Sequence, residues 1–333
     1  MKNTATSKKE AFVTWLRFFA CILITNSHCR DIYPYYFLAV GGGHGNAIFF
    51  ALSGFCLANI KQTFFKWYGR RLKRLIPTTI IIVLISMIFI EGFNGVGAMG
   101  IGGAFLHYVN KYWFIPAILI YYCIFYFIFE NGNSKTALYS LIVYTVVYFI
   151  LYFTVIDRTK FSVELEGFSL FKVYYYLGIF IAGGLLRQLT EKLTNLDGAE
   201  RKKKRNISIA VIAVSAVIWC GVYAAIMVFG KAFSVQFLIH AGVFAFTVAL
   251  MVLMILYKDR IKLGNGFGSK LITTISESTL EIYLVQVTFK QAVTSLGFPI
   301  NWFAFVIVAF IGGIILHELT GFIIKPIDKR KAA

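Results

Sequence analysis

Charged side chains are scarce in this chain, and acidic ones are scarcer than basic ones. Only 14% of the 333 residues are charged, with 15 Asp and Glu against 33 Lys and Arg, which gives a formal net charge of +18. A soluble globular domain has about 25% charged residues, so that class is excluded. Nucleic-acid-binding proteins carry such a positive charge on a polar fold. Here the charges interrupt long apolar runs, so no nucleic-acid partner is expected.

Metal-ligand and hydrolase motifs are also missing. No H-E-x-x-H and no G-x-S-x-G segment occurs, so neither a metal site nor a nucleophile elbow is expected. The cysteines have no C-x2-C spacing and are expected to be small buried apolar residues. They are Cys21, Cys29, Cys56, Cys123 and Cys220.

Apolar and aromatic residues are abundant instead. The 34 Phe, 19 Tyr and 5 Trp exclude a disordered chain. Crossing a bilayer takes about 20 apolar residues, and ten stretches of this chain qualify. The sequence therefore predicts the all-α class, a polytopic transmembrane helical bundle that forms a single domain over 1–333. The predicted spans lie near 11–29, 36–60, 75–93, 112–130, 137–156, 173–189, 207–229, 234–257, 271–293 and 302–324.

The positions of Lys and Arg predict the orientation of these spans. With ten crossings and a cytoplasmic N-terminus, 25 of the 33 Lys and Arg lie inside and 7 lie outside. Cytoplasmic loops carry such an excess of Lys and Arg, so both termini are expected in the cytoplasm. Most of the positive charge therefore reflects membrane topology, and the lipid bilayer is an expected partner. No small-residue cleavage site follows the first apolar run, so that run is expected to be a retained helix.

Arg17 and His28 belong to the first predicted span, and ionisable groups at bilayer depth are functional candidates. Their separation of eleven residues places them about 20° apart around a helix and about 16 Å apart along its axis. Cys21 and Ile24 lie between them on that face. This helix face would line a narrow tunnel, with an anion held near Arg17 at its inner mouth and proton chemistry at His28 at its far end. Alternatively, Arg17 extends to the inner headgroups and His28 only ends the helix.

Arg70, Arg71 and Arg74 precede the third predicted span, in the segment RRLKRLIP. On a helix, Arg74 shares a face with Arg70 at i+4 and lies beside Arg71 at i+3. Guanidinium groups bind phosphates bidentately. The alternative is that such a basic loop reflects topology alone.

Four other polar residues are weaker candidates. Glu281, four residues after Glu277, is expected to pair with a buried His or Arg, or to make an interhelical hydrogen bond. His44, in GGGHGN, lies near the outer mouth of the second predicted span, where glycines permit close approach. Ser53 is expected to pack or hydrogen-bond at a helix contact. No role follows for His240, His317 or Glu318.

Several segments together resemble the type-3 acyltransferase family, membrane enzymes that O-acetylate surface sugars. Arg17 and His28 resemble its Arg-x10-His signature, and RRLKRLIP resembles its R-x-x-R-I-x-P. NAIFFALSGFCLA, YWFIPAILIYY (with Trp113) and ISESTLEIYLVQ resemble three further family segments, and all five lie in the family order. Gln286 stands where many members have His, and Ile118 stands where one subgroup has Glu, so no role is carried over to either position.

The resemblance implies an O-acyltransferase, most simply an O-acetyltransferase, in the plasma membrane of a bacterium. Acetyl-CoA or another acyl-CoA would be the donor substrate, with no permanently bound cofactor. Its phosphates would be held at the cytoplasmic rim by Arg17, Arg70, Arg71 and Arg74.

At the other end, His28 would act as general base on a sugar hydroxyl of a lipid-linked or exported polysaccharide, or would carry the acyl group itself. Weaker substrate contacts would come from His44, Ser53, Trp113 and Glu281.

Two other classes are weighed against this interpretation. A transporter or flippase would suit sparse buried charges, but carriers often show internal repeats with broken helices, and no repeat is visible here. A polysaccharide polymerase generally needs a sizeable outer loop, whereas the longest clear outer loop, 157–172, has about 16 residues.

Overall fold

The computed structural model describes residues 10–92, 97, 99–163, 167–230 and 233–329, and these contain helices and no strand. The basic residues of segments 1–9 and 330–333, and Lys231, which enter the charge count, lie outside the described residues. The helices are α1 (Ala11–Ser27), α2 (Gly42–Leu57), α3 (Phe64–Ser86), α5 (Gly100–Lys111), α6 (Phe114–Phe129), α7 (Ser134–Thr154), α8 (Leu170–Gln188), α9 (Thr190–Thr194), α10 (Gly198–Phe229), α11 (Phe237–Leu256), α12 (Phe267–Glu277), α13 (Thr279–Thr294) and α14 (Ile300–Lys329), with short turns η1 (Tyr36–Leu38), η2 (Met87–Glu91) and η3 (Phe233–Val235).

The all-α prediction is confirmed, and part of the predicted set of spans is supported. Among the described residues, six helices are long and apolar enough to cross a membrane, and the bent pair α5–α6 would make seven. Helices α1, α2, α6 and α13 occupy other predicted spans but have only 16 or 17 residues each. The chain is therefore a multi-pass membrane protein, and the count of ten crossings stays a prediction.

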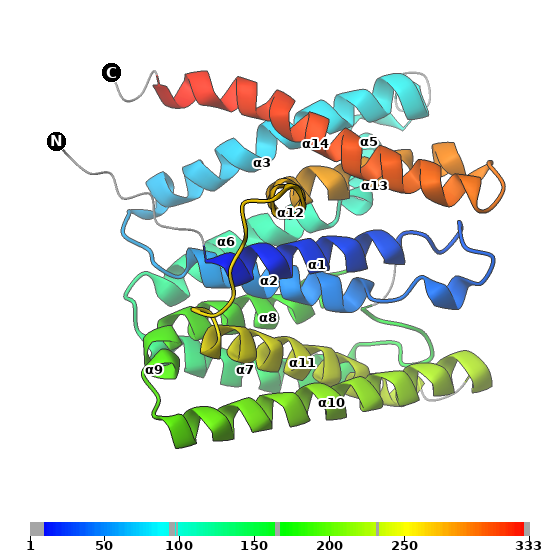
Figure 1. Cartoon of the computed structure of the whole chain (residues 1–333). Helices are drawn as coiled ribbons and strands as arrows, with labels where there is room; N and C mark the ends of the chain where they lie inside the picture. The colour runs from blue at the N-terminus through cyan, green and yellow to red at the C-terminus, as the bar shows by residue number, and fades with distance from the viewer. Residues whose placement is uncertain (1–9, 93–96, 98, 164–166, 231–232, 330–333) are drawn as a thin grey trace.

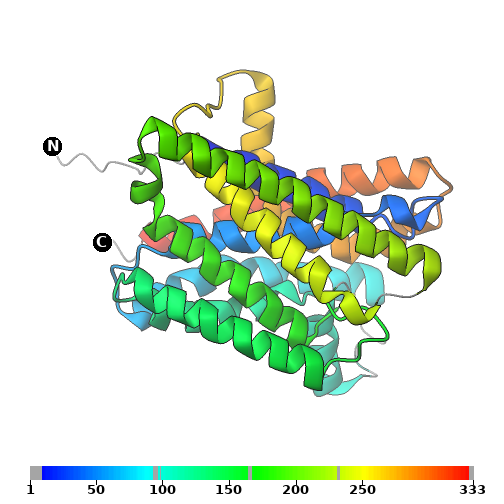
Figure 2. The same ribbon diagram turned by 90° about the horizontal axis from the view of Figure 1, so that it is seen from below.

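Most helices lie side by side along one direction (Figures 1 and 2). Helices α1, α3 and α10 begin at the end of the bundle where α14 finishes (Figure 1). The basic segments 70–74 on α3 and 201–205 on α10 are therefore near the same end. The predicted orientation places both basic segments in the cytoplasm, which requires them to lie at the same end of the bundle.

The third predicted span starts later in the sequence than the helix that contains it. The predicted range starts at residue 75, but helix α3 starts at Phe64 and includes the basic segment. Long basic side chains are good helix formers, and Trp67, only 2% exposed, anchors this first part of α3 in the core. Arg70, Arg71 and Arg74 therefore have fixed helical positions instead of lying in a loop.

Two breaks interrupt the regular bundle. Helices α5 and α6 meet at an angle of 81°, so the glycine-rich segment before α6 is a separate short helix. The predicted span 271–293 is wrong as one continuous helix, because it is divided at Ser278 into α12 and α13. Helix α12 crosses the direction of the other helices and is seen end-on in Figure 1 and from the side in Figure 2.

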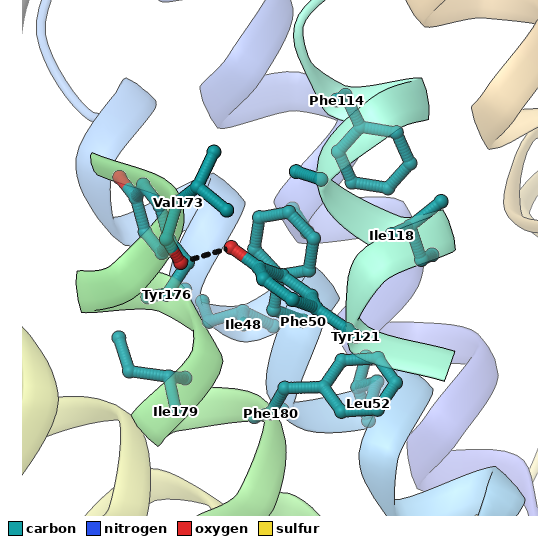
Figure 3. Packing of buried hydrophobic residues seen from close by; sticks show 14 of the residues in the cluster. Ile48, Phe50, Leu52, Phe114, Ile118, Tyr121, Val173, Tyr176, Ile179 and Phe180 are labelled. Atoms are coloured by element: carbon teal, nitrogen blue, oxygen red, sulfur yellow. Dashed lines mark hydrogen bonds between the residues drawn. The ribbon is translucent and has the colours of Figure 1, made fainter. Parts of the chain in front are cut away.

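The core is aromatic and tightly packed around α2, α6 and α8. Phe50 stacks on Phe114 with ring centroids 4.9 Å apart, and the Tyr121 hydroxyl donates to the carbonyl of Val173 (Figure 3). At the crossing of α2 and α8, a Cβ added to Gly54 or Gly183 would collide with a backbone carbonyl of the other helix. Small residues permit such close helix contacts in membranes, and this rigid unit forms one side of the site described next.

Candidate active site

A cavity of about 160 Å³ lies where α1, α2, α3 and α6 meet the break between α12 and α13. Two guanidinium groups from different helices, Arg17 of α1 and Arg74 of α3, line it. Polar groups are added by Ser53, Tyr122 and Glu277, and apolar walls by Phe49 and Phe114, among others. The sequence separates the two arginines by 57 residues, and the fold places them on one cavity.

The electrostatic character of this cavity favours an anion. Arg17 is half-buried, and its Nη2 lies 3.5 Å from Sγ of Cys56. Tyr122, buried in the wall, interacts electrostatically with Arg74, Arg71 and Arg17. Glu277 is the only carboxylate on this wall among the described residues. Two guanidinium groups facing one partly buried space suit a phosphate-bearing ligand.

The three clustered arginines have different positions. Arg74 lines the cavity. Arg71 is half-buried, and its guanidinium lies over the Trp67 ring, 4.5 Å from the centroid, an attractive cation–π contact. Arg70 is exposed and does not line the cavity. The sequence placed all three in one phosphate site, whereas the structure brings only Arg74 directly to Arg17.

His28 lies at the C-terminal end of α1, half-buried and outside the lining of the cavity. Its ring is 6.3 Å from the ring of Tyr283 on α13. Tyr283 is in turn 5.6 Å from Phe114, which lines the cavity. The Phe114–Tyr283 aromatic pair therefore lies between the arginine cavity and the imidazole.

The prediction that the α1 face between Arg17 and His28 lines an open tunnel is wrong. Cys21 and Ile24 do lie between Arg17 and His28, but they are only 2% and 7% exposed. Cys21 packs in an apolar cluster with Ile282 and Ala309. The physical reason is that Ile24 packs against Gly45 of α2, whereas α12 and α13 pack against the helix around Cys21.

A hydrogen-bond network fixes the end of α1 that carries His28. The backbone N–H of His28 donates to the carbonyls of Ile24 and Thr25. The Asn26 side chain donates to the carbonyls of Leu38 and Val40, each at 2.9 Å. These bonds attach the end of α1 to the segment that precedes α2.

Tyr33 connects the same network to α14. Its hydroxyl donates to Oδ1 of Asn26 at 2.7 Å and accepts from Nε1 of Trp302 at 3.1 Å. Burial raises the pKa of Tyr33, so the phenol keeps its proton at neutral pH and can donate. These bonds hold the backbone at the end of α1, which carries His28.

Glu281 has the histidine partner that its position led us to expect. Oε1 of Glu281 lies 3.3 Å from Nδ1 of His317 on α14. Both residues line a second cavity of about 130 Å³ together with Arg74. The two cavities therefore meet at Arg74.

The remaining candidates have mixed positions. Ser53 lines the first cavity, and its hydroxyl donates to the carbonyl of Phe49. His44 lies between the rings of Trp219 and Phe246, at 5.2 and 5.0 Å, away from both cavities. Trp113 packs below the ammonium group of Lys172, at 4.4 Å, and lines neither cavity.

Three aromatic residues of the site carried no signal of their own in the sequence. Tyr122, Phe114 and Tyr283 are members of long apolar helices, where aromatic residues are most often packing residues. Phe114 and Tyr122 do belong to the segment YWFIPAILIYY, and Tyr283 to ISESTLEIYLVQ. The motif resemblance was therefore the one available pointer to them. Among the described residues, no group of three His, Cys, Asp or Glu residues could hold a metal ion.

Comparison with known proteins gives one finding. The model of the acyltransferase 3 family, described as an acyltransferase domain, matches residues 10–317. No curated protein and no solved structure matches the chain.

Proposed function

The chain belongs to the acyltransferase 3 family and is a membrane acyltransferase, and we propose that it transfers an acyl group from cytoplasmic acyl-CoA to a sugar hydroxyl. The acyl group is most simply acetyl, and the acceptor is a cell-surface or lipid-linked polysaccharide. The observation that carries the proposal is the cavity that Arg17 of α1 and Arg74 of α3 share. The location that fits is the bacterial plasma membrane, with the end of the bundle where α1 and α3 begin (Figure 1) in the cytoplasm.

The donor end of the reaction uses the arginines. Arg17 and Arg74 hold phosphate groups of CoA from two sides of the cavity, and Arg71 adds charge from behind Tyr122. Arg70 increases the local positive potential at the surface and makes the smallest contribution. Ser53 and Cys56 lie on the same wall and face the donor.

The chemical end of the reaction uses His28. A neutral imidazole removes the proton of the acceptor hydroxyl as its oxygen attacks the thioester carbonyl. The C–S bond breaks, the new ester forms, and the proton passes from the imidazolium to the CoA thiolate. Atoms and charge balance without a further reactant. The less direct alternative is that the imidazole first takes the acyl group and then passes it to the hydroxyl.

The Phe114–Tyr283 pair sets a condition on this route. The cavity holds the arginines, and His28 lies behind these two rings. The thioester must therefore pass between them, so the rings must turn when the pantetheine arm enters.

Replacement of His28 by alanine tests the assignment. We expect loss of acyl transfer, read as loss of O-acetyl signals in the polysaccharide by NMR, at normal abundance of the inserted protein. His107→Gln is the matched control, because His107 is a half-exposed histidine near the outer end whose Nε2 contacts Glu91. Retained acetylation in His28→Ala would rule out His28 as the base.

A second measurement separates the two roles of His28. Wild-type protein is incubated with radiolabelled acetyl-CoA and no acceptor, then separated from free donor. A general base leaves the protein unlabelled, whereas a covalent carrier retains label that is absent from His28→Ala. The transporter alternative is not proposed, because the family is one of acyltransferases.

A further inference from the structure

Arg74 forms part of the wall of two cavities. One is the cavity shared with Arg17, and the other lies between α3, α13 and α14. The second cavity is lined by Arg74, Thr78, Glu281, His317 and Thr320, with Gly321 and Ile324. An arginine side chain at this position can point its guanidinium into either space by rotation of its flexible stem.

Glu281 in the second cavity has incomplete hydrogen bonding. The residue is 2% exposed. Its Oε1 contacts His317 at 3.3 Å, whereas its Oε2 is buried and has no hydrogen-bond partner among the described residues. Leaving a buried carboxylate oxygen unsatisfied is destabilising. Of the described residues, Arg74 is the one Lys or Arg that lines this cavity.

We propose that Glu281 and His317 act as a positioning pair for Arg74. Arg74 exchanges between Oε2 of Glu281 in the second cavity and the first cavity, and acyl-CoA binding holds it in the first cavity. Glu281 therefore competes with the donor phosphates for one guanidinium. This inference rests on the proposed function, since it presupposes that Arg74 binds the donor.

His317 sets the strength of this competition. Its imidazole contacts the other carboxylate oxygen of Glu281 and also interacts electrostatically with Arg74. Removing the imidazole leaves Arg74 as the main partner of Glu281 and holds it more firmly in the second cavity. Removing the negative charge of Glu281 releases Arg74. The two substitutions should therefore change donor affinity in opposite directions.

The test is direct binding of CoA to purified full-length protein in lipid nanodiscs, measured by titration calorimetry without acceptor. We expect Glu281→Gln to lower the Kd about fivefold and His317→Gln to raise it about fivefold, a modest effect because Arg74, the partner of the buried Glu281, is itself exposed. The double variant should bind like Glu281→Gln. Thr320→Val is the control, because Thr320 lines the same cavity and its hydroxyl donates only to the carbonyl of His317 on its own helix.

A purely structural pair would give a different result. Loss of packing would weaken binding in both single variants and lower the midpoint of thermal unfolding in both, and this outcome would overturn the proposal. Repeating both substitutions in an Arg74→Gln background provides a second check, since neither should then change the Kd. A change that persists without Arg74 would also overturn it. If wild-type protein does not bind CoA, the proposed function and this inference both fail.

Discussion

Arg74→Ala should weaken acyl-CoA binding much more than Arg70→Ala, although the two residues are one helical turn apart. Both side chains are exposed, but Arg74 lines the cavity that Arg17 also lines, whereas Arg70 lines neither cavity. A hydrogen bond to a charged group contributes about 1.5–3 kcal/mol. Each 1.4 kcal/mol changes the Kd about tenfold. The expected loss for Arg74→Ala is therefore about 10- to 150-fold.

Arg70→Ala removes an exposed charge that acts only over distance. Such charges contribute about 0–1 kcal/mol and are screened by salt, so the Kd should rise less than about fivefold. Arg71→Ala should fall between the two, because Arg71 lies near Tyr122 but also packs on Trp67.

The assay is titration of CoA into purified protein in nanodiscs at low and high salt. Raising the salt should remove the effect of Arg70→Ala and leave most of the effect of Arg74→Ala. Arg74→Lys keeps the charge but loses the planar fork, so an intermediate Kd is expected. Equal losses for Arg70→Ala and Arg74→Ala would refute the reasoning and reduce the cluster to a diffuse basic surface.

Three further predictions concern packing, the end of α1 and access to the cavity. Gly183→Ala should lower the free energy of unfolding by about 1–3 kcal/mol, because the added methyl group overpacks against the Ala51 carbonyl. The expected readout is a lower midpoint of thermal unfolding; an unchanged midpoint would show that α2 and α8 can separate. Asn26→Ala should cost about 2–3 kcal/mol through three lost hydrogen bonds and should lower turnover more than donor affinity; the reverse pattern would contradict a role in fixing His28. Cys56 is exposed on the cavity wall, so CoA should slow its labelling by a maleimide; equal labelling rates at Cys56 with and without CoA would place the donor elsewhere.

The sequence determined the class of the protein because hydrophobic length and charge bias are local properties. Ten apolar stretches with few charges predict helices in a membrane, and the structure has a helix in or near every predicted range. The spacing of Arg17 and His28 correctly placed them along one helix, since Arg17 lies within α1 (Ala11–Ser27) and His28 directly follows its last residue. Motif order was specific enough to indicate the family that the chain belongs to.

Distances along one helix could not predict what packs against it. The face between Arg17 and His28 was expected to be open, yet α2 covers Ile24, and α12 and α13 pack around Cys21. The bends at Ser278 and between α5 and α6 could not be placed from hydropathy, because hydropathy reports depth in the bilayer and not the direction of the backbone.

Tertiary structure alone decided which charges meet. Three arginines look equivalent in RRLKRLIP, but the start of α3 at Phe64 and the burial of Trp67 fix the rotation of the helix, so that only Arg74 reaches the cavity of Arg17. Glu281 and His317 lie 36 residues apart and on different helices, yet they meet beside Arg74. Helix rotation and helix crossing are long-range consequences of packing, and the amino-acid pattern of one segment does not contain them.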